Sequence, residues 1–230
     1  MIDPNYLWLA ERFCARLFAE RPVSVLDVGC GTGHVVGRCY EHDVPALGLD
    51  WSRKKLALVR AAGFRCARAP AAPLPVRDGA FDWVAIRHVL HHVPDPRAAV
   101  AEACRVARTG LLLAEPWFDQ GLSTQVVSKR AQDWIKAQER RHGGHHAPAI
   151  DHHGLLRLLP AGRIASWEIE HHFRLWPLPV ERFHEHAARW LERLPAGDPE
   201  RAAHDAIVRD LATHGLTDCG TVILTVRLRA

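Results

Sequence analysis

Nine residues near the beginning of the chain constrain its fold more than any other feature. Residues 25–33 read VLDVGCGTG, a short apolar run followed by three glycines at alternate positions. The glycines allow the backbone to turn tightly and a ligand to approach closely, and a helix can begin at Gly33. Such a strand–turn–helix is common in nucleotide-binding sheets, although the glycine spacing alone is weak support. No Gly-Lys-Ser follows, which argues against a phosphate-binding P-loop.

Two acidic residues accompany this turn. Asp27 lies within the apolar run, two residues before the first glycine, and Asp50 ends the second apolar segment. A carboxylate at the end of a second strand can accept hydrogen bonds from ribose hydroxyls. Trp51, the next residue, offers a flat face for stacking on a purine, or alternatively covers the sheet edge. These residues favour a ligand that contains a nucleoside.

The first half of the chain alternates between strand and helix signals. Short apolar segments predict strands at residues 23–28, 45–49, 64–68, 81–86 and 111–115. Helical periodicity and capping residues predict helices at 5–20, 33–40, 52–63 and 95–106. Strands separated by helices at this spacing indicate a parallel sheet with helices on both faces.

The second half has a different pattern. Amphipathic or capped segments predict helices at 122–141, 151–159, 180–194 and 198–215, and apolar residues predict strands at 164–172 and 221–228. We expect the helical pair at 180–214 to be an insertion before the last strand. It would act as a cap over a site rather than as a second domain.

Composition narrows the class of protein. The 230 residues are 48% hydrophobic and 24% charged, enough for one globular domain with a sizeable core. A net charge of +4 from interspersed residues is weak support for a polyanionic partner. Six scattered cysteines without a Cys-x-x-Cys pair favour free thiols over disulfides or structural zinc. Without a long apolar run or a signal-peptide pattern, a cytoplasmic location is the default expectation.

Four segments, taken in order, resemble a known family. They are VLDVGCGTG at 25–33, GLD at 48–50, LPVRDGAFDWV at 74–84 and RHVLHHVPDP at 87–96. This series resembles the class I S-adenosylmethionine-dependent methyltransferases, in the small-molecule branch related to the ubiquinone-pathway enzymes. The resemblance covers residues 20–116, about half the chain.

The resemblance and the second half together predict one α/β domain. Its sheet would be Rossmann-like and seven-stranded, mostly parallel with an antiparallel last strand, with helices on both faces and a helical cap inserted before that strand. Within a single methyltransferase domain, 1–230, we expect residues 1–120 to bind the cofactor. Residues 121–215 would form the acceptor-binding and cap region, and residues 216–230 would supply the last strand.

The resemblance also implies the cofactor, S-adenosylmethionine, and its contacts. The residues concerned are Asp27, Gly29, Cys30, Gly31, Gly33, Asp50, Trp51, Ala71 and Arg87. The turn at 27–33 would hold the methionine part, Asp50 the ribose, Trp51 the adenine, and the Arg87 backbone the ammonium group. The family often has an acidic residue where this chain has Pro70, so the contact to the adenine amine would pass to backbone near Ala71.

Several acceptor classes lack their sequence signature. Residues 87–90, RHVL, replace the Asn/Asp-Pro-Pro-Tyr motif of enzymes that methylate the amino groups of nucleic-acid bases. A Pro-Cys nucleophile and the metal-binding Asp of the catechol type are absent there, and no basic stripe with interleaved aromatic residues is present. We therefore expect methyl transfer to oxygen or nitrogen of a small metabolite, secondary metabolites included. No nucleic acid, membrane or metal is expected, and the protein would be a monomer or homodimer.

Histidine is unusually frequent, with 16 residues, 11 of them after residue 120. His88 follows the fourth strand, at the sheet edge where such folds bind ligands, and is our candidate for a catalytic base or substrate contact. A hydrogen-bonded structural role is the alternative. Trp117 follows the fifth strand and either lines the acceptor pocket or packs in the core.

A histidine-rich segment at 142–153 has three interpretations. It can be a mobile loop whose His142, His145 and His146 contact the substrate, a solvated loop, or a metal site. Two glycines at 143–144 interrupt it, so no helical i, i+4 pair of metal ligands is preset, and we expect no metal there.

Two other function classes stay open on the sequence alone. An NAD-type oxidoreductase uses a similar glycine turn, but Asp27 before the glycines and the LPVRDGAFD block fit a sulfonium cofactor better. A methyltransferase fold can also bind the cofactor without transferring a methyl group, or serve another reaction. Pro70 is the sequence feature that points in that direction.

Overall fold

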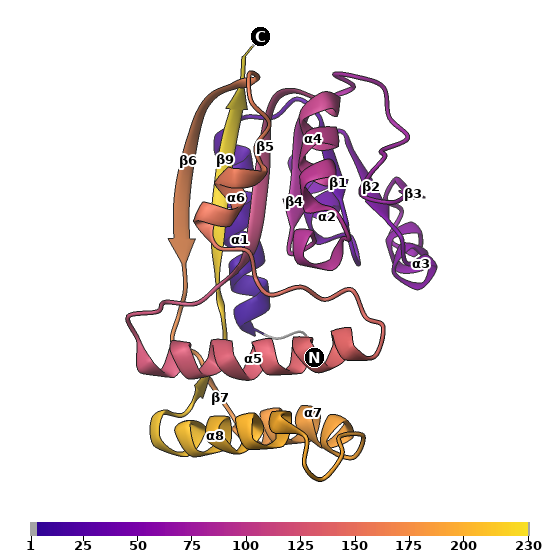
Figure 1. The fold of residues 1–230 in the computed structure, drawn as a ribbon. Coiled ribbons are helices and arrows are strands. Elements are labelled where there is room, and N and C mark those ends of the chain that lie inside the picture. Colours follow the sequence, from indigo (N-terminus) through magenta and orange to yellow (C-terminus); the bar gives the residue numbers. More distant parts are fainter. Residues whose placement is uncertain (1–3, 230) are drawn as a thin grey trace.

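The computed structural model describes residues 4–229 and is built on a seven-stranded sheet (Figure 1). In spatial order the strands are β3 (Cys66–Arg68), β2 (Ala46–Asp50), β1 (Val25–Val28), β4 (Phe81–Arg87), β5 (Ala107–Trp117), β9 (Gly220–Leu228) and β6 (Ile164–His172). Neighbouring strands are parallel, except that β9 is antiparallel to both β5 and β6. The expected sheet, mostly parallel with a reversed last strand, is confirmed.

Helices cover both faces because the central strands are apolar on both sides. Along β4, Trp83 and Ala85 pack in one core cluster and Val84 and Ile86 in another. The first cluster includes side chains of α1 (Pro4–Ala19), α2 (His34–Glu41) and α3 (Arg53–Ala61), and the second includes side chains of α4 (Pro96–Val106) and α6 (His152–Leu158). Parallel strands that are buried on both faces produce the continuous apolar runs seen in the sequence.

The strand order changes direction at β1, which has β2 on one side and β4 on the other. Open α/β sheets bind ligands at the carboxyl ends of their strands, at such a switch point. The glycine turn follows β1 directly and leads into α2. The topology therefore places the 25–33 segment where a ligand site is expected.

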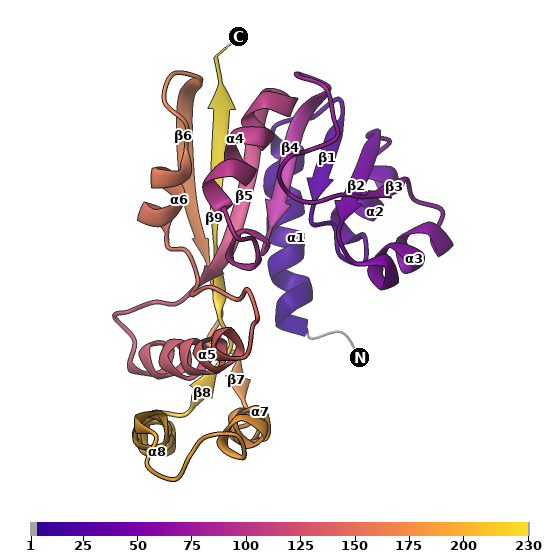
Figure 2. The same ribbon diagram turned by 45° about the vertical axis from the view of Figure 1, so that its right-hand side comes forward.

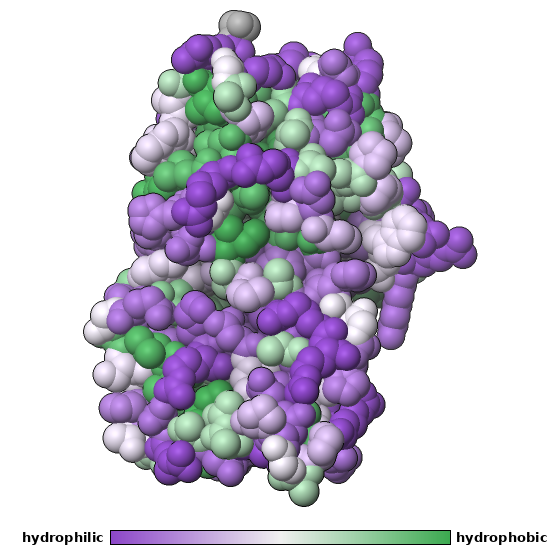
Figure 3. All heavy atoms as spheres, in the orientation of Figure 1, coloured by the Kyte–Doolittle hydropathy of each residue, from purple (hydrophilic) through white to green (hydrophobic). Residues whose placement is uncertain are grey.

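One long helix, α5 (Ser123–Arg141), crosses the carboxyl edge of the sheet (Figures 1 and 2). Beyond it lie α7 (Glu181–Leu191), α8 (Pro199–His214) and a ribbon formed by β7 (Pro177–Leu178) and β8 (Leu216–Thr217). The three helices share an apolar cluster separate from those of the sheet. The pair α7–α8 is inserted before β9 as expected, and the face of this region seen in Figure 3 is mostly hydrophilic.

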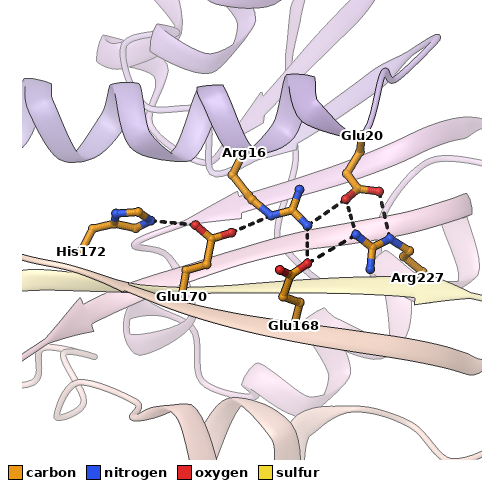
Figure 4. A network of polar contacts seen from close by, with 6 residues as sticks. All are labelled: Arg16, Glu20, Glu168, Glu170, His172 and Arg227. Carbon is orange, nitrogen blue, oxygen red and sulfur yellow. Dashed lines mark hydrogen bonds and ion pairs between the residues drawn. The ribbon is translucent and has the colours of Figure 1, made fainter.

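Ion pairs connect the first helix to the far edge of the sheet (Figure 4). The Arg16 guanidinium on α1 lies 2.8 Å from oxygens of both Glu20 and Glu168, and its Nε lies 2.7 Å from Glu170. Arg227 on β9 lies 2.5 Å from Glu20, and this hydrogen-bonded pair holds the pKa of Glu20 below its ordinary value. Because β6 is an edge strand, the network attaches it to α1 across β9.

Candidate active site

The glycine turn after β1 is held against the end of β2. The amides of Gly29 and Cys30 both donate to the carbonyl of Leu49, at 2.7 and 2.9 Å. Gly29 has φ +75°, and a Cβ built on it would lie 2.2 Å from a methyl carbon of Val89. Only glycine fits this conformation and this contact. The turn therefore has a bare backbone surface that a ligand can approach.

Asp50 connects the glycine turn to the next loop. One carboxylate oxygen accepts the Gly31 amide at 2.9 Å, and the other accepts the Ser52 amide at 2.7 Å. The carboxylate also lines a cavity of about 320 Å³, together with Trp51 and Ala71. The exposed Trp51 ring has the Arg68 guanidinium 3.9 Å from its centroid. This cavity is within the size range of small-molecule sites.

A second cavity, of about 420 Å³, adjoins the first. Gly29, Lys55, His88 and His92 line both. The walls of the second cavity are the glycine turn and α2, the end of β4 with the 3-10 helix η1 (Leu90–His92), and α5. The two cavities therefore lie on either side of one glycine turn at the switch point.

Asp27 is the buried acid of this larger cavity. Its side chain is 2% exposed, and one carboxylate oxygen has no hydrogen-bond partner among residues 4–229. Burial raises its pKa to about 7, which Arg87 opposes and Asp50 reinforces. A buried oxygen without a donor is costly, and a bound cationic group would satisfy it. The methionine part of S-adenosylmethionine, with its ammonium and sulfonium, fits this carboxylate.

His88 stands between the two cavities in a strained backbone conformation. Its φ is +55°, its amide donates to the carbonyl of Ala114 at 2.8 Å, and its Nε2 lies 3.1 Å from the Thr221 hydroxyl. Burial, with Arg87 next in effect, lowers its pKa well below the ordinary histidine value. The imidazole is therefore neutral at neutral pH but a weak base. Positive φ is uncommon in a non-glycine residue, so the surrounding contacts must hold His88 in this conformation.

A family model for the methyltransferase domain matches residues 26–114. Demethylmenaquinone methyltransferase of Shouchella clausii is 34% identical over 38% of this chain and 41% of its own length. O-methyltransferase rstn1 of Aspergillus nomiae is 32% identical over 53% of this chain and 59% of its own length. The crystal structure of the YcgJ protein from Bacillus subtilis superposes with a TM-score of 0.64, at 17% identity, over 95% of this chain and 98% of that chain.

Residues 26–114 carry a methyltransferase domain of the S-adenosylmethionine-dependent type, and the likeness to the solved structure shows that its fold extends over the rest of the chain. The resemblance read from the four sequence segments is thereby confirmed, and S-adenosylmethionine is the cofactor that this family and fold imply. The chain spans less than two thirds of the length of the two curated relatives named above. Within the described part of the chain, no helix has the length and apolar character needed to cross a membrane.

The methyltransferase domain brings most of the expected cofactor residues to the two cavities. Those that line a cavity are Asp27, Gly29, Cys30, Gly31, Asp50, Trp51, Ala71 and Arg87. Gly33 does not line either one, but its φ of +89° shapes the turn into α2. Pro70 is exposed and lies outside both cavities, next to Ala71, which lines the smaller one.

Of the four residues expected to contact the acceptor, His146 lines the larger cavity. The His142 ring instead packs 4.9 Å from Trp190, and its Nδ1 lies 2.9 Å from the carbonyl of Gln138. His145 is exposed and outside the cavity lining. Trp117 packs 4.5 Å from the His171 ring and lines a separate cavity of about 270 Å³.

Two residues of the site were not found from the sequence. Lys136 on α5 is 3% exposed, lines the larger cavity, and has no hydrogen-bond partner for its ammonium among the described residues. Glu115 on β5 is fully buried and accepts the amides of Val89 and Leu90 at 3.1 and 2.9 Å. The position of Glu115 at the end of a predicted apolar strand could have indicated a buried acid. Lysine is ordinary on an amphipathic helix, so nothing in the sequence indicated the burial of Lys136.

Proposed function

We propose that this protein transfers a methyl group from S-adenosylmethionine to oxygen or nitrogen of a small molecule. The observation that carries the proposal is the pair of adjoining cavities around one glycine turn. The smaller suits a nucleoside, and the larger has, at the turn, an Asp27 carboxylate oxygen with no hydrogen-bond partner in the described part of the chain, with free volume beyond it under α5. The curated relatives named above include a demethylmenaquinone methyltransferase and an O-methyltransferase, both by name methyltransferases.

In this proposal the cofactor is held by the residues that the family resemblance named. Asp50 would accept hydrogen bonds from the ribose, with the adenine between Trp51 and the backbone at Ala71. The turn from Asp27 to Gly33 and the Arg87 backbone would hold the methionine part. When bound, S-adenosylmethionine supplies an electrophilic methyl group.

The chain's own residues contribute position, charge and shielding from water. Helix α5 closes the larger cavity with Gln132, Ile135 and Lys136. Holding two reactants in line can supply on the order of 7–11 kcal/mol of the barrier in favourable cases. Of the two roles expected for His88, its lowered pKa favours accepting a hydrogen bond from an acceptor hydroxyl or amine over acting as a base.

The acceptor in this proposal carries a carboxylate or an acidic hydroxyl. The Lys136 ammonium is buried and has no hydrogen-bond partner among residues 4–229, which is unfavourable unless a ligand pairs with it. Burial lowers the pKa of Lys136, with Asp133 and then Glu115 opposing that effect. An anionic oxygen bound beside Lys136 would relieve the desolvation cost and would also be the nucleophile or lie near it.

Calorimetric titration with S-adenosylhomocysteine tests the proposal. We expect wild type to bind in the micromolar range, about −8 kcal/mol. Asp50→Asn preserves the shape of the side chain and removes its charge, so binding should weaken at least tenfold. Asp210→Ala, on α8 far from the cavities, is the matched control and should bind like wild type.

The same titrations separate the rival functions. Binding of NADH in place of S-adenosylhomocysteine would support the oxidoreductase and end the methyltransferase proposal. Tight S-adenosylhomocysteine binding without methylation of any anionic or hydroxylated acceptor would favour a cofactor-binding protein that serves another reaction. No binding of either nucleotide to wild type would overturn the proposal.

A further inference from the structure

We propose that His91, His92 and His146 form a binding site for a divalent transition metal of the zinc type, in the wall of the larger cavity. Each residue offers one ring nitrogen, and these three nitrogens all lie within 4.8 Å of one another. His91 and His92 belong to η1, and His146 belongs to the loop that follows α5. All three side chains line the cavity.

Two of the three imidazoles are already oriented by carboxylates. His91 Nδ1 lies 2.5 Å from Glu115, and His146 Nδ1 lies 2.5 Å from Glu139. A ring that donates its Nδ1–H to a carboxylate leaves Nε2 as a lone-pair donor. Metal-binding histidines almost always have such a partner, which fixes the ring and raises its basicity.

The loop that carries His146 is held in place by hydrogen bonds to backbone carbonyls. The Ala147 amide donates to the carbonyl of His91 at 2.8 Å, and the Arg140 guanidinium donates to the carbonyl of His146 at 2.6 Å. The rings of His92 and His146 then lie 4.4 Å apart, and those of His91 and His146 lie 5.2 Å apart. The convergence is therefore built by the backbone and is not a chance meeting of surface rings.

The charges around the cluster also suit a cation. Glu115 is fully buried and Glu139 is half-buried, and together their two carboxylates balance a divalent ion. The Lys136 side chain on α5 lines the same cavity, and its positive charge would repel the ion. A ligand with an anionic oxygen placed between the metal and Lys136 would compensate both positive charges.

Three histidine nitrogens and an open cavity match a catalytic rather than a structural metal site. Imidazole ligands suit zinc, and also iron, cobalt, nickel and copper. A ligand on the open position would be the acceptor oxygen, whose O–H proton passes to water while the metal holds the oxygen. That role rests on the proposed function, whereas metal binding itself does not.

This site differs from the one considered on the sequence. The segment 142–153 contributes only His146, because His145 is exposed and His152 packs with His153 and His171. The other two ligands come from η1, more than fifty residues earlier in the chain. We expected no metal because the spacing of histidines within that one segment does not preset a ligand pair. The three histidines of this site come from two distant segments, so that argument does not apply to them.

The test is binding of Zn²⁺ alone to the metal-stripped 230-residue protein, by calorimetry and equilibrium dialysis, with Co²⁺ as a spectroscopic probe. Wild type should bind one equivalent, and Co²⁺ should give the visible absorption of a site with nitrogen ligands. His92→Ala and His146→Ala should each weaken Zn²⁺ binding at least tenfold. Glu139→Gln should weaken it by about 10–100-fold, as loss of such a carboxylate partner does.

Two controls keep the result interpretable. His153→Ala removes an exposed histidine outside the cluster and should bind Zn²⁺ like wild type. Thermal melting of each variant checks its fold. Equal Zn²⁺ stoichiometry and affinity in wild type and in the His92→Ala/His146→Ala double variant would overturn the proposal, and so would no binding to wild type. S-adenosylhomocysteine titration of the same samples shows whether a variant that has lost Zn²⁺ binding still binds the cofactor product, which separates failure of the metal site from failure of the proposed function.

Discussion

Three features of individual side chains at this site reduce the stability of the free protein. Asp27 has a carboxylate oxygen without a hydrogen-bond partner among the described residues, and the Lys136 ammonium also lacks one. His88 adopts a positive φ. Each of these features costs free energy of folding on the order of 1–3 kcal/mol. All three lie on the wall of the same cavity, so their cost is concentrated where bound molecules could offset it.

Asp27→Asn should stabilise the free protein and weaken cofactor binding. The carboxyl has a pKa of 3.8 when unfolded and about 7 when folded, so the folded state holds the proton more tightly. Wild type therefore loses stability as pH rises from about 4 to 7, whereas the variant does not. At pH 8 its free energy of unfolding should exceed that of wild type by on the order of 2 kcal/mol.

Urea unfolding of both proteins at pH 5 and pH 8 checks this prediction. A difference that is the same at both pH values would contradict the role of Asp27 ionisation. S-adenosylhomocysteine affinity, measured on the same samples, should be lower in the variant at pH 8, and the difference should be smaller at pH 5, where Asp27 is protonated in the free protein.

The elements follow local signals closely where those signals are strong. Asp95 accepts the Ala98 amide at 2.9 Å and Asp198 accepts the Glu200 amide at 2.9 Å, so both Asp-Pro pairs begin helices as expected. β5 is longer than expected, at Ala107–Trp117 instead of 111–115. The extra residues have little strand propensity of their own. They are part of the strand because they pair with β4 and β9, which satisfies the hydrogen-bonding groups of their backbone.

A prediction at the scale of one element concerns the buried lysine of helix α5. Lys136→Met should raise the free energy of unfolding by about 1 kcal/mol, because it replaces a buried, unpaired ammonium with an apolar side chain of similar length. Lys129→Met on the same helix is the control, since Lys129 pairs with Asp133 at 2.5 Å and is partly exposed. The control should change stability by less than about 0.5 kcal/mol. If both variants are equally stable, the burial of Lys136 is not the cause.

At the scale of the whole molecule, two layers meet at the carboxyl edge of the sheet. The sheet with its covering helices forms one layer, and α5 with α7 and α8 forms the other, with its own apolar cluster (Figures 1 and 2). The larger cavity lies between the glycine turn of the first layer and α5 of the second. The helices α7 and α8 pack behind α5 and are not part of the lining of the larger cavity.

The network on α1, β6 and β9 should stabilise this arrangement. Arg16→Ala should lower the free energy of unfolding at pH 7 by about 1–2 kcal/mol, because its guanidinium is 12% exposed and faces three carboxylates. The folded pKa of Glu20 is lowered from 4.5, so its contribution is complete above that pH and is lost as pH falls further. Arg130→Ala, which breaks an exposed pair with Asp210, should cost less than about 0.5 kcal/mol.

Denaturant unfolding at pH 7 and at pH 3 distinguishes the two variants. The deficit of Arg16→Ala should shrink at the lower pH, because Glu20 takes up a proton as the pH falls through its lowered folded pKa and its pair with Arg16 is then lost. A deficit that is unchanged at pH 3 would assign the loss to packing of the arginine side chain instead.

Local sequence patterns were sufficient to predict the sheet, most of its helices and strands, and the glycine turn. Apolar runs, helical periodicity, N-caps and glycines act within a few residues, so their effect can be predicted before the chain folds. The set of side chains that share the larger cavity followed only from the packing of distant segments. The packing of α5 across the sheet edge brings His146 to His91 and His92 and buries Lys136. It also leaves His142 and Trp117 outside the lining of the larger cavity. Such packing sums many weak contacts between distant segments, and no local pattern encodes it.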